Sequence, residues 1–238
     1  KVFAKLKKIY FLATVDYKWK PNSTRFNVRI FDIETSESEN LGHFETSLIG
    51  AIGVENSLGA ITTLHTLGFD YQCLEEGISS FPGLRRRLEL VHDKDFKVIN
   101  DFAHSPIKIE STLKSIRIKY PDNKVFVIFH VNQSGLKEKR TFEQLKTSFN
   151  YADYVLIPRV TPDPKQVEQL YGKDYRDLIK DGALDAEYLK ASNVYYTPLG
   201  VQMQSVLENN VKTNDVIVIM GSGDVEESLS IANNLRIS

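Results

Sequence analysis

The sequence predicts an α/β protein in two parts. The residues before Phe81 are rich in β-branched and aromatic strand patterns followed by helical ones, which favours an antiparallel sheet flanked by helices. From Phe96 onward, predicted strands alternate with predicted helices, as in a mostly parallel sheet that helices cover on both faces. A Pro-Gly break and three consecutive arginines separate the two regions.

Length and composition narrow the classes of protein that this chain can represent. A length of 238 residues exceeds what one typical core needs and favours one large or two modest domains. The net charge of −1 gives no basic excess, so we expect no nucleic-acid partner. No apolar run approaches the roughly 18 residues of a membrane span and no signal peptide is visible, so we expect no membrane partner.

The single cysteine, Cys73, excludes an internal disulfide and fits a reducing compartment, so we expect a cytoplasmic protein. Nothing nearby in the sequence would activate its thiol, which predicts a small core residue. No Cys/His cluster has zinc spacing, and no metal site is predicted. Because the chain opens on Lys1 rather than methionine, we expect a fragment of a longer protein.

The first region predicts an antiparallel sheet with one face toward solvent. Lys8–Tyr17 is mostly β-branched and aromatic, and Thr24–Ile33 alternates polar and apolar residues with a period of two. A turn at Pro21–Ser23 joins them, and His43–Leu48 predicts a third strand after an acidic loop. We expect His43 to be a surface residue rather than a ligand.

Two helices are predicted next. Ile49–Gly68 carries an apolar stripe that includes Val54 and Ile61, and Gly68 stands where a helix C-terminus favours glycine. Asp70–Ser80 reads as a shorter helix that packs on the first. His65 is expected to be a helix-face residue, not a metal ligand, because no second histidine or cysteine lies at ligand spacing.

The segment Phe81–Val91 is predicted to connect the two regions. Its Arg85, Arg86 and Arg87 allow two interpretations. They form either a solvated cationic rim or a phosphate-recognition element, since guanidinium groups bind phosphate oxygens in pairs. Local sequence leaves both open.

The second region predicts a strand at Phe96–Ile99, a helix at Pro106–Lys119 and a strand at Lys124–Phe129. Further elements are predicted in chain order: helix Thr141–Phe149, strand Tyr151–Pro158, strand Asn193–Thr197, helix Val201–Asn209, strand Asp215–Met220 and helix Val225–Leu235. Asp224 is expected to cap the last helix. The Gly221–Gly223 turn resembles a phosphate-binding turn, but such turns serve close packing about as often.

Polar side chains follow the first strand of this region. Asp101 and His104 come directly after it, at the carboxyl end where open α/β sheets bind ligands. Ser105 can cap the following helix, and Pro106 suits its first turn. A carboxylate, an imidazole and free helix N–H groups are therefore expected in one crevice. No G-x-x-x-x-G-K-[ST] phosphate loop occurs, so the chain cannot cradle a nucleoside triphosphate in the usual way by itself.

Three motifs in order, FPGLRRRLE, NDFAHSP and MGSGDV, resemble the Mur ligases. These are ATP-dependent amide ligases that add amino acids or peptides to UDP-N-acetylmuramate, and the resemblance is strongest to the branch that adds L-alanine or recycles murein tripeptide. It implies that residues 1–82 are the C-terminal part of the central ATPase domain, that 83–92 are a linker, and that 93–238 are a Rossmann-like C-terminal domain with a mostly parallel sheet.

The resemblance also implies roles for individual residues. Asp101 would hold the ATP ribose, and Asn56 matches a nucleotide-binding asparagine. Arg86 or Arg87 would reach the γ-phosphate, which suits the need for fixed positive charge where an acyl-phosphate forms. His104 would lie at the substrate side of the cleft, with the remaining substrate contacts at Ser105, Lys137 and Arg140.

Departures from the family pattern are present too. The adenine-contacting His-Asn pair is Ile52-Gly53 here, and Asn100 and Ser105 replace an aspartate and a histidine. The implied cofactors are ATP and Mg²⁺, both bound mainly by residues absent from this chain. The implied partners are a UDP-N-acetylmuramate-type nucleotide and an amino acid or peptide. Two other hypotheses remain: a relative without ATP chemistry, and a small-molecule-binding domain of unknown ligand.

Overall fold

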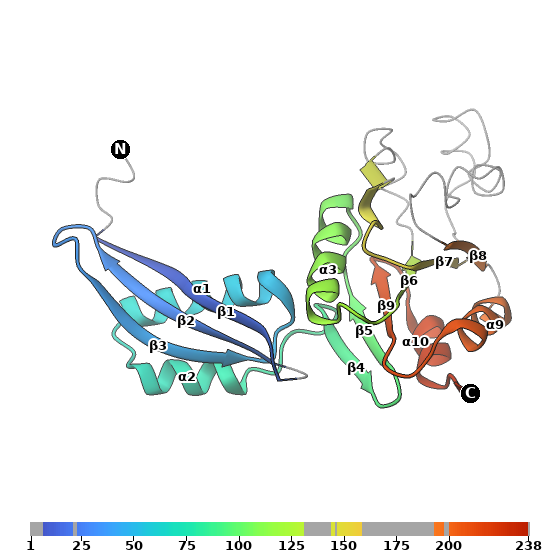
Figure 1. Cartoon of the computed structure of the whole chain (residues 1–238), viewed down its shortest axis with the longest axis horizontal. Coiled ribbons are helices and arrows are strands. Elements are labelled where there is room, and N and C mark those ends of the chain that lie inside the picture. The colour runs from blue at the N-terminus through green and yellow to red at the C-terminus, as the bar shows by residue number, and fades with distance from the viewer. Residues whose placement is uncertain are drawn as a thin grey trace. The chain divides into compact units, whose positions relative to one another are not determined.

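The computed structural model in Figure 1 divides into two compact units, Lys1–Gly83 and Leu84–Ser238. Each unit has a sheet and a buried core of its own. The structure describes residues 7–20, 23–130, 144–145, 147–158, 193–197 and 200–237.

The first unit contains an antiparallel sheet in the order β1-β2-β3. Its strands are β1 (Lys8–Lys20), β2 (Ser23–Asp32) and β3 (Ser38–Thr46), which confirms the predicted antiparallel arrangement. β3 begins earlier than predicted, because the polar residues Glu39 and Asn40 pair with β2 across from Ile30 and Arg29. Polar residues are common on such an edge strand, where they discourage further pairing.

The helices α1 (Gly50–Thr66) and α2 (Tyr71–Ser80) follow as predicted. α1 ends in a Schellman motif: Gly68 has a φ of +96°, its N–H donates to the His65 carbonyl, and the Phe69 N–H donates to the Leu64 carbonyl. The core between helices and sheet is formed by Phe26, Val28, Phe44, Val54, Ile61 and Leu74.

The prediction that Cys73 is a core residue is wrong. Its side chain is exposed, and its N–H donates to the Asp70 carboxylate that caps α2. Leu74 is the residue of this helix that is buried, so Cys73 occupies the polar side of a one-faced helix. His43 is exposed, as expected, and His65 Nδ1 lies 2.8 Å from the Tyr10 hydroxyl.

The described part of the second unit contains a sheet in the order β4-β5-β9-β6-β7-β8. β4 is antiparallel to β5, and all other neighbours are parallel, which confirms the predicted α/β class. The strands are β4 (Glu89–Asp93), β5 (Lys97–Asp101), β6 (Val125–His130), β7 (Tyr154–Pro158), β8 (Asn193–Thr197) and β9 (Val216–Gly221).

Sequence reasoning missed β4, most of which falls within the segment predicted as a linker. The strand is short, mixes charged and apolar residues, and contains a register shift between Leu90 and His92. Edge strands of this kind lack the apolar alternation that identifies a half-buried strand.

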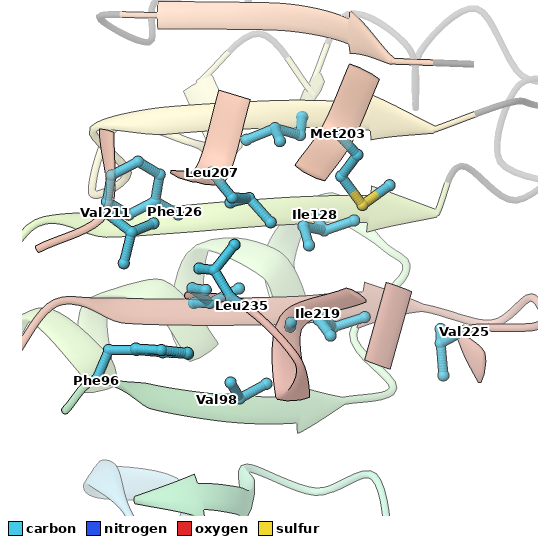
Figure 2. Packing of buried hydrophobic residues seen from close by; sticks show 13 residues of the cluster. Phe96, Val98, Phe126, Ile128, Met203, Leu207, Val211, Ile219, Val225 and Leu235 are labelled. Carbon is cyan, nitrogen blue, oxygen red and sulfur yellow. The ribbon is translucent and has the colours of Figure 1, made fainter. Parts of the chain in front are cut away.

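Helices cover both faces of this sheet. Met203 and Leu207 of α9 (Gly200–Asn210) join a buried cluster with Phe126 and Ile128 of β6 (Figure 2). α10 (Glu226–Asn233) packs beside α9. α3 (Pro106–Lys119) matches the predicted bounds and covers the opposite face. Its Thr112 hydroxyl donates to Asp101 of β5, and Asp101 points to the other side of the strand from Val98 of the buried cluster, because side chains alternate along a strand.

Other predicted features are met only in part. The prediction that Asp224 caps the last helix is wrong, because α10 begins one residue later and Val225 occupies its N-cap position without a side-chain capping bond. Asp224 precedes the N-cap, and its carboxylate accepts the Glu226 N–H at 3.0 Å. The turn at Pro21–Ser23 and the helix at Thr141–Phe149 lie partly outside the described residues. None of the helices in the described parts of the chain has the length and apolar character that a membrane span requires.

The register places three strand ends side by side. β9 lies between β5 and β6, with Asp101 paired to Met220 and His130 paired to Gly221. The carboxyl ends of these central parallel strands therefore form one edge, which is the usual ligand-binding edge of an open α/β sheet.

Gly221 at this edge cannot accept a side chain. Its φ is +135°, and an added Cβ would lie 2.3 Å from the His130 carbonyl oxygen. We expect Gly221→Ala to lower the free energy of unfolding by at least about 2 kcal/mol, measured by urea denaturation. Gly223→Ala is the matched control, because its nearest neighbour, His130 Cβ, lies at an ordinary 3.9 Å. Equal effects of the two changes would contradict the described turn.

Candidate functional site

The carboxylate of Asp101 lies at the carboxyl edge of the sheet, at the end of β5. The side chain is only 5% exposed. Its Oδ2 accepts the Leu88 N–H at 2.8 Å, and its Oδ1 accepts the Ala103 N–H at 2.7 Å and the Thr112 hydroxyl at 3.3 Å. One anion thus joins the arginine segment, the turn after β5 and helix α3. A carboxylate has about four acceptor sites, so a ribose hydroxyl would have to share this one with the protein.

The arginine segment turns a tight corner at residues 86–88. Arg86 and Leu88 are both in the left-handed region, with φ of +56° and +48°. Residues with a Cβ pay roughly 1 to 2 kcal/mol for this conformation, so it needs support. The Arg86 N–H donates to the Glu89 carboxylate at 2.8 Å, and the Phe102 N–H donates to the Arg86 carbonyl at 2.8 Å.

The side chain of Arg86 binds within the protein. Its Nη2 donates to the carbonyl oxygens of Gly221 at 2.6 Å and Gly223 at 3.2 Å. Its guanidinium also lies over the Phe102 ring, 4.9 Å from the centroid. Arg86 is therefore not part of a solvated cationic rim. It also does not fully fit a phosphate-recognition element, because its Nη2 already donates to carbonyl oxygens of the protein.

Arg87 differs from Arg86. Its side chain is exposed, with its guanidinium 5.5 Å from the centroid of the same Phe102 ring. The Arg87 backbone N–H donates to the Leu84 carbonyl at 3.2 Å, but within the described residues its guanidinium makes no hydrogen bond. An exposed guanidinium that lies over an aromatic ring can bind an anion.

The Gly221–Gly223 turn serves close packing in this structure. Two of its carbonyls accept from Arg86, and Gly221 lies directly against the backbone of His130. The first turn of α10 carries Glu226 and Glu227, and acidic side chains disfavour a bound anion there. The resemblance to a phosphate-binding turn gains no support from these contacts.

His104 and Ser105 lie at the start of α3, next to the corner. His104 Nδ1 lies 2.9 Å from the Phe102 carbonyl, and its ring meets the Phe102 ring edge to face. Both side chains are half-buried. Ser105 occupies the N-cap position, but its side chain makes no capping bond, contrary to the prediction. Its extended backbone and Pro106 begin the helix without that bond.

Two residues of this edge were missed by sequence reasoning. His130 ends β6 with its Nε2 2.9 Å from the Ser228 hydroxyl, and its pKa is lowered from 6.5 to about 4, chiefly by burial. The Asp224 carboxylate partly opposes this shift, and the Arg86 cation contributes to it. Asn100 is 4% exposed, and its Oδ1 has no partner among the described residues. Both residues come directly after a predicted strand, which was the available signal, whereas the structure places them at the carboxyl ends of β5 and β6.

The remaining predicted residues are not among the described residues of the second unit. Asn56 is exposed on α1 of the first unit. Lys137 and Arg140 lie outside the described residues. The second unit therefore brings together Arg86, Arg87, Asp101, His104 and Ser105. No group of three or more His, Cys, Asp or Glu within the described part could hold a metal ion.

A family model described as "Mur ligase, glutamate ligase domain" matches residues 86–223. The match covers more than half of the chain and includes both the arginine corner and the Gly221–Gly223 turn. The protein belongs to the Mur ligase family, as the three motifs predicted.

Individual relatives support the assignment to the Mur ligase family. The chain is 30% identical over 219 residues to UDP-N-acetylmuramate–L-alanine ligase of Caldicellulosiruptor saccharolyticus, covering 90% of this chain and 45% of the relative. It is 29% identical over 189 residues to the ligase of the same name from Brachyspira hyodysenteriae, covering 79% of this chain and 39% of the relative. The chain thus spans less than half the length of these relatives.

Solved structures share the fold. UDP-N-acetylmuramate–alanine ligase of Thermotoga maritima matches with a TM-score of 0.67 and 19% identity, covering 94% of this chain and 45% of that one. A murein peptide ligase of Psychrobacter arcticus matches with a TM-score of 0.58 and 22% identity, covering 98% and 46%.

We expect Asp101→Asn to lower the free energy of unfolding of the second unit by about 1 to 3 kcal/mol in urea denaturation. An amide has one acceptor oxygen, so its NH₂ group would oppose either the Leu88 or the Ala103 N–H. Asp122→Asn is the control, because that side chain is exposed. An unfolding midpoint for Asp101→Asn equal to the control would contradict this account.

Stability should fall in acid because of His130. The unfolded chain takes up a proton near pH 6.5, whereas the folded protein does so only near pH 4. The contribution is complete above pH 6.5 and is lost as the pH falls toward 4, by up to ~3 kcal/mol. Urea denaturation between pH 4 and 7 should show a smaller loss for His130→Gln. Parallel curves of unfolding free energy against pH for the wild-type protein and His130→Gln would show that His130 does not cause the loss in acid.

Proposed function

We propose that this protein is an ATP-dependent amide ligase of peptidoglycan precursor synthesis or recycling. It would join an amino acid or peptide to a UDP-N-acetylmuramate-type nucleotide, in the cytoplasm. The observation that carries the proposal is the exposed Arg87 at the sheet's carboxyl edge, in a chain of the Mur ligase family. Its guanidinium lies over Phe102, between Asp101 at the end of β5 and His104 in the turn that follows.

The chemistry follows two steps. A substrate carboxylate attacks the γ-phosphorus of ATP, which gives an acyl-phosphate and releases ADP. The amine then attacks the acyl carbon, phosphate leaves and an amide remains. The attacked phosphoryl group carries negative charge that a fixed cation stabilises most in the transition state. Of the two guanidinium groups at the corner, that of Arg87 makes no hydrogen bond within the described residues and can therefore bind the phosphoryl group.

The other proposed roles follow the family. Asp101 and Asn56 would contact the nucleotide, and His104 and Ser105 the substrate, together with Lys137 and Arg140. The described residues do not fit a Mg²⁺ site, so no step is assigned to a metal held by them. The phosphate loop and most ATP and Mg²⁺ contacts would come from residues that this chain lacks.

A second candidate function is a Mur-ligase-like binding protein without ATP chemistry. Ile52 and Gly53 stand where the family resemblance places an adenine-contacting His-Asn pair, and Ile52 is 42% exposed on α1. Losing one such contact costs about 1 to 3 kcal/mol, which weakens nucleotide binding without abolishing it. The ligase is therefore the better supported candidate.

The complete protein should release ADP only when ATP, UDP-N-acetylmuramate or a peptide derivative of it, and an amine are all present. We expect Arg87→Gln to lower kcat/KM about 10²- to 10³-fold, because a preorganised charge at the phosphoryl group is lost. Arg85→Gln, on the neighbouring exposed arginine, is the control and should change kcat/KM little.

Two results separate the candidates. No substrate-dependent ADP release with any amine, together with no ATP binding by calorimetry, would favour the binding protein. Normal turnover by Arg87→Gln would remove Arg87 from the mechanism while leaving the ligase activity intact.

A further inference from the structure

The corner at residues 86–88 presents Arg87 in an unusual way. Arg87 stands between two residues whose backbones are both left-handed, Arg86 and Leu88. Left-handed residues with side chains persist only where their surroundings enforce them, and such strain concentrates at functional sites. The corner therefore needs an anchor on each side of Arg87.

The anchor after Arg87 is a backbone bond. The Leu88 N–H donates to the buried Asp101 carboxylate at 2.8 Å. Because the acceptor is charged and shielded from water, this bond is stronger than one between neutral groups. It ties the corner to the end of β5.

The anchor before Arg87 includes a side chain. Arg86 Nη2 donates to the carbonyls of Gly221 and Gly223, which tie the corner to the end of β9. The Arg86 carbonyl also accepts the Phe102 N–H. Arg86 Nε is buried without a partner in the described residues, so the guanidinium is held through its Nη2 end and the Phe102 ring.

The two guanidinium groups share the Phe102 ring, at 4.9 Å and 5.5 Å from its centroid. The charge of Arg86 is directed at two carbonyl oxygens, which are partial negative charges. The charge of Arg87 has no such partner among the described residues. Arg86 is thus hydrogen-bonded within the protein, whereas the Arg87 guanidinium can bind a ligand.

We infer that Arg86 is a positioning residue that fixes the 86–88 corner to the Gly221–Gly223 turn and thereby aims the Arg87 guanidinium at a phosphoryl group. This inference rests on the proposed function. The sequence left open whether Arg86 or Arg87 reaches the γ-phosphate, and the inference assigns contact with the phosphoryl group to Arg87 and its positioning to Arg86. Arg86 makes no contact with the ligand; its effect on turnover passes through Arg87.

The test compares Arg86→Gln, Arg86→Lys and Arg87→Gln in the complete protein, with Arg85→Gln as the matched control. Amide hydrogen exchange at Leu88 and Phe102, without substrate, reports the corner directly. ADP-release kinetics at varied ATP report the catalytic consequence. Arg86→Lys keeps the charge and can still donate to a carbonyl, so it also covers the case in which Arg86→Gln fails to fold.

We expect Arg86→Gln to speed exchange at Leu88 and Phe102 roughly ten- to hundredfold and to lower kcat/KM for ATP about tenfold. Arg86→Lys should recover part of both. Arg87→Gln should leave the exchange rates within about twofold and lower kcat/KM more strongly. Arg85→Gln should change neither.

Two results would overturn the inference. If Arg86→Gln leaves exchange unchanged and loses as much kcat/KM as Arg87→Gln, Arg86 contacts the ligand itself. If exchange speeds up but the kinetics do not change, Arg86 is structural only. A wild-type protein that releases no ADP contradicts the proposed function instead, and the exchange rates still decide whether Arg86 holds the corner.

Discussion

The second unit depends on one buried anion. Asp101, at the end of β5, accepts hydrogen bonds from Leu88, Ala103 and Thr112, which belong to three separate segments. Burying a carboxylate is costly unless it is fully hydrogen-bonded, so the three donors and the charge support one another. Without it, the left-handed corner, the turn after β5 and the packing of α3 would each lose a partner.

This constraint explains why the arginine segment belongs to the second unit. The segment predicted as a linker is bound to the sheet by backbone and side-chain bonds, and β4 continues it along the edge of β5. The chain divides into its two compact units between Gly83 and Leu84, just before the corner. A cation on this corner moves with the sheet's carboxyl edge, which is what a nucleotide site at that edge requires.

The sequence predicted what local patterns determine. The start of α3 follows from Pro106, and the placement of Asp101 at the carboxyl end of a buried strand follows from the strand pattern. It did not predict which arginine is engaged, because the Arg86 bond to Gly221 joins residues 135 positions apart. The exposure of Cys73 and the edge strand β4 were missed for a related reason: a weak local pattern says little about which face meets the core. The assignment to the Mur ligase family rested on motif order, and the family model confirms it.

Asp101 and Arg86 hold one corner together. A double-mutant cycle of Asp101→Asn and Arg86→Gln, followed by urea denaturation of the complete protein, measures this dependence. We expect the two losses of unfolding free energy not to be additive, with a coupling of about 1 kcal/mol or more. Losses that add within about 0.3 kcal/mol would show instead that the two residues act independently.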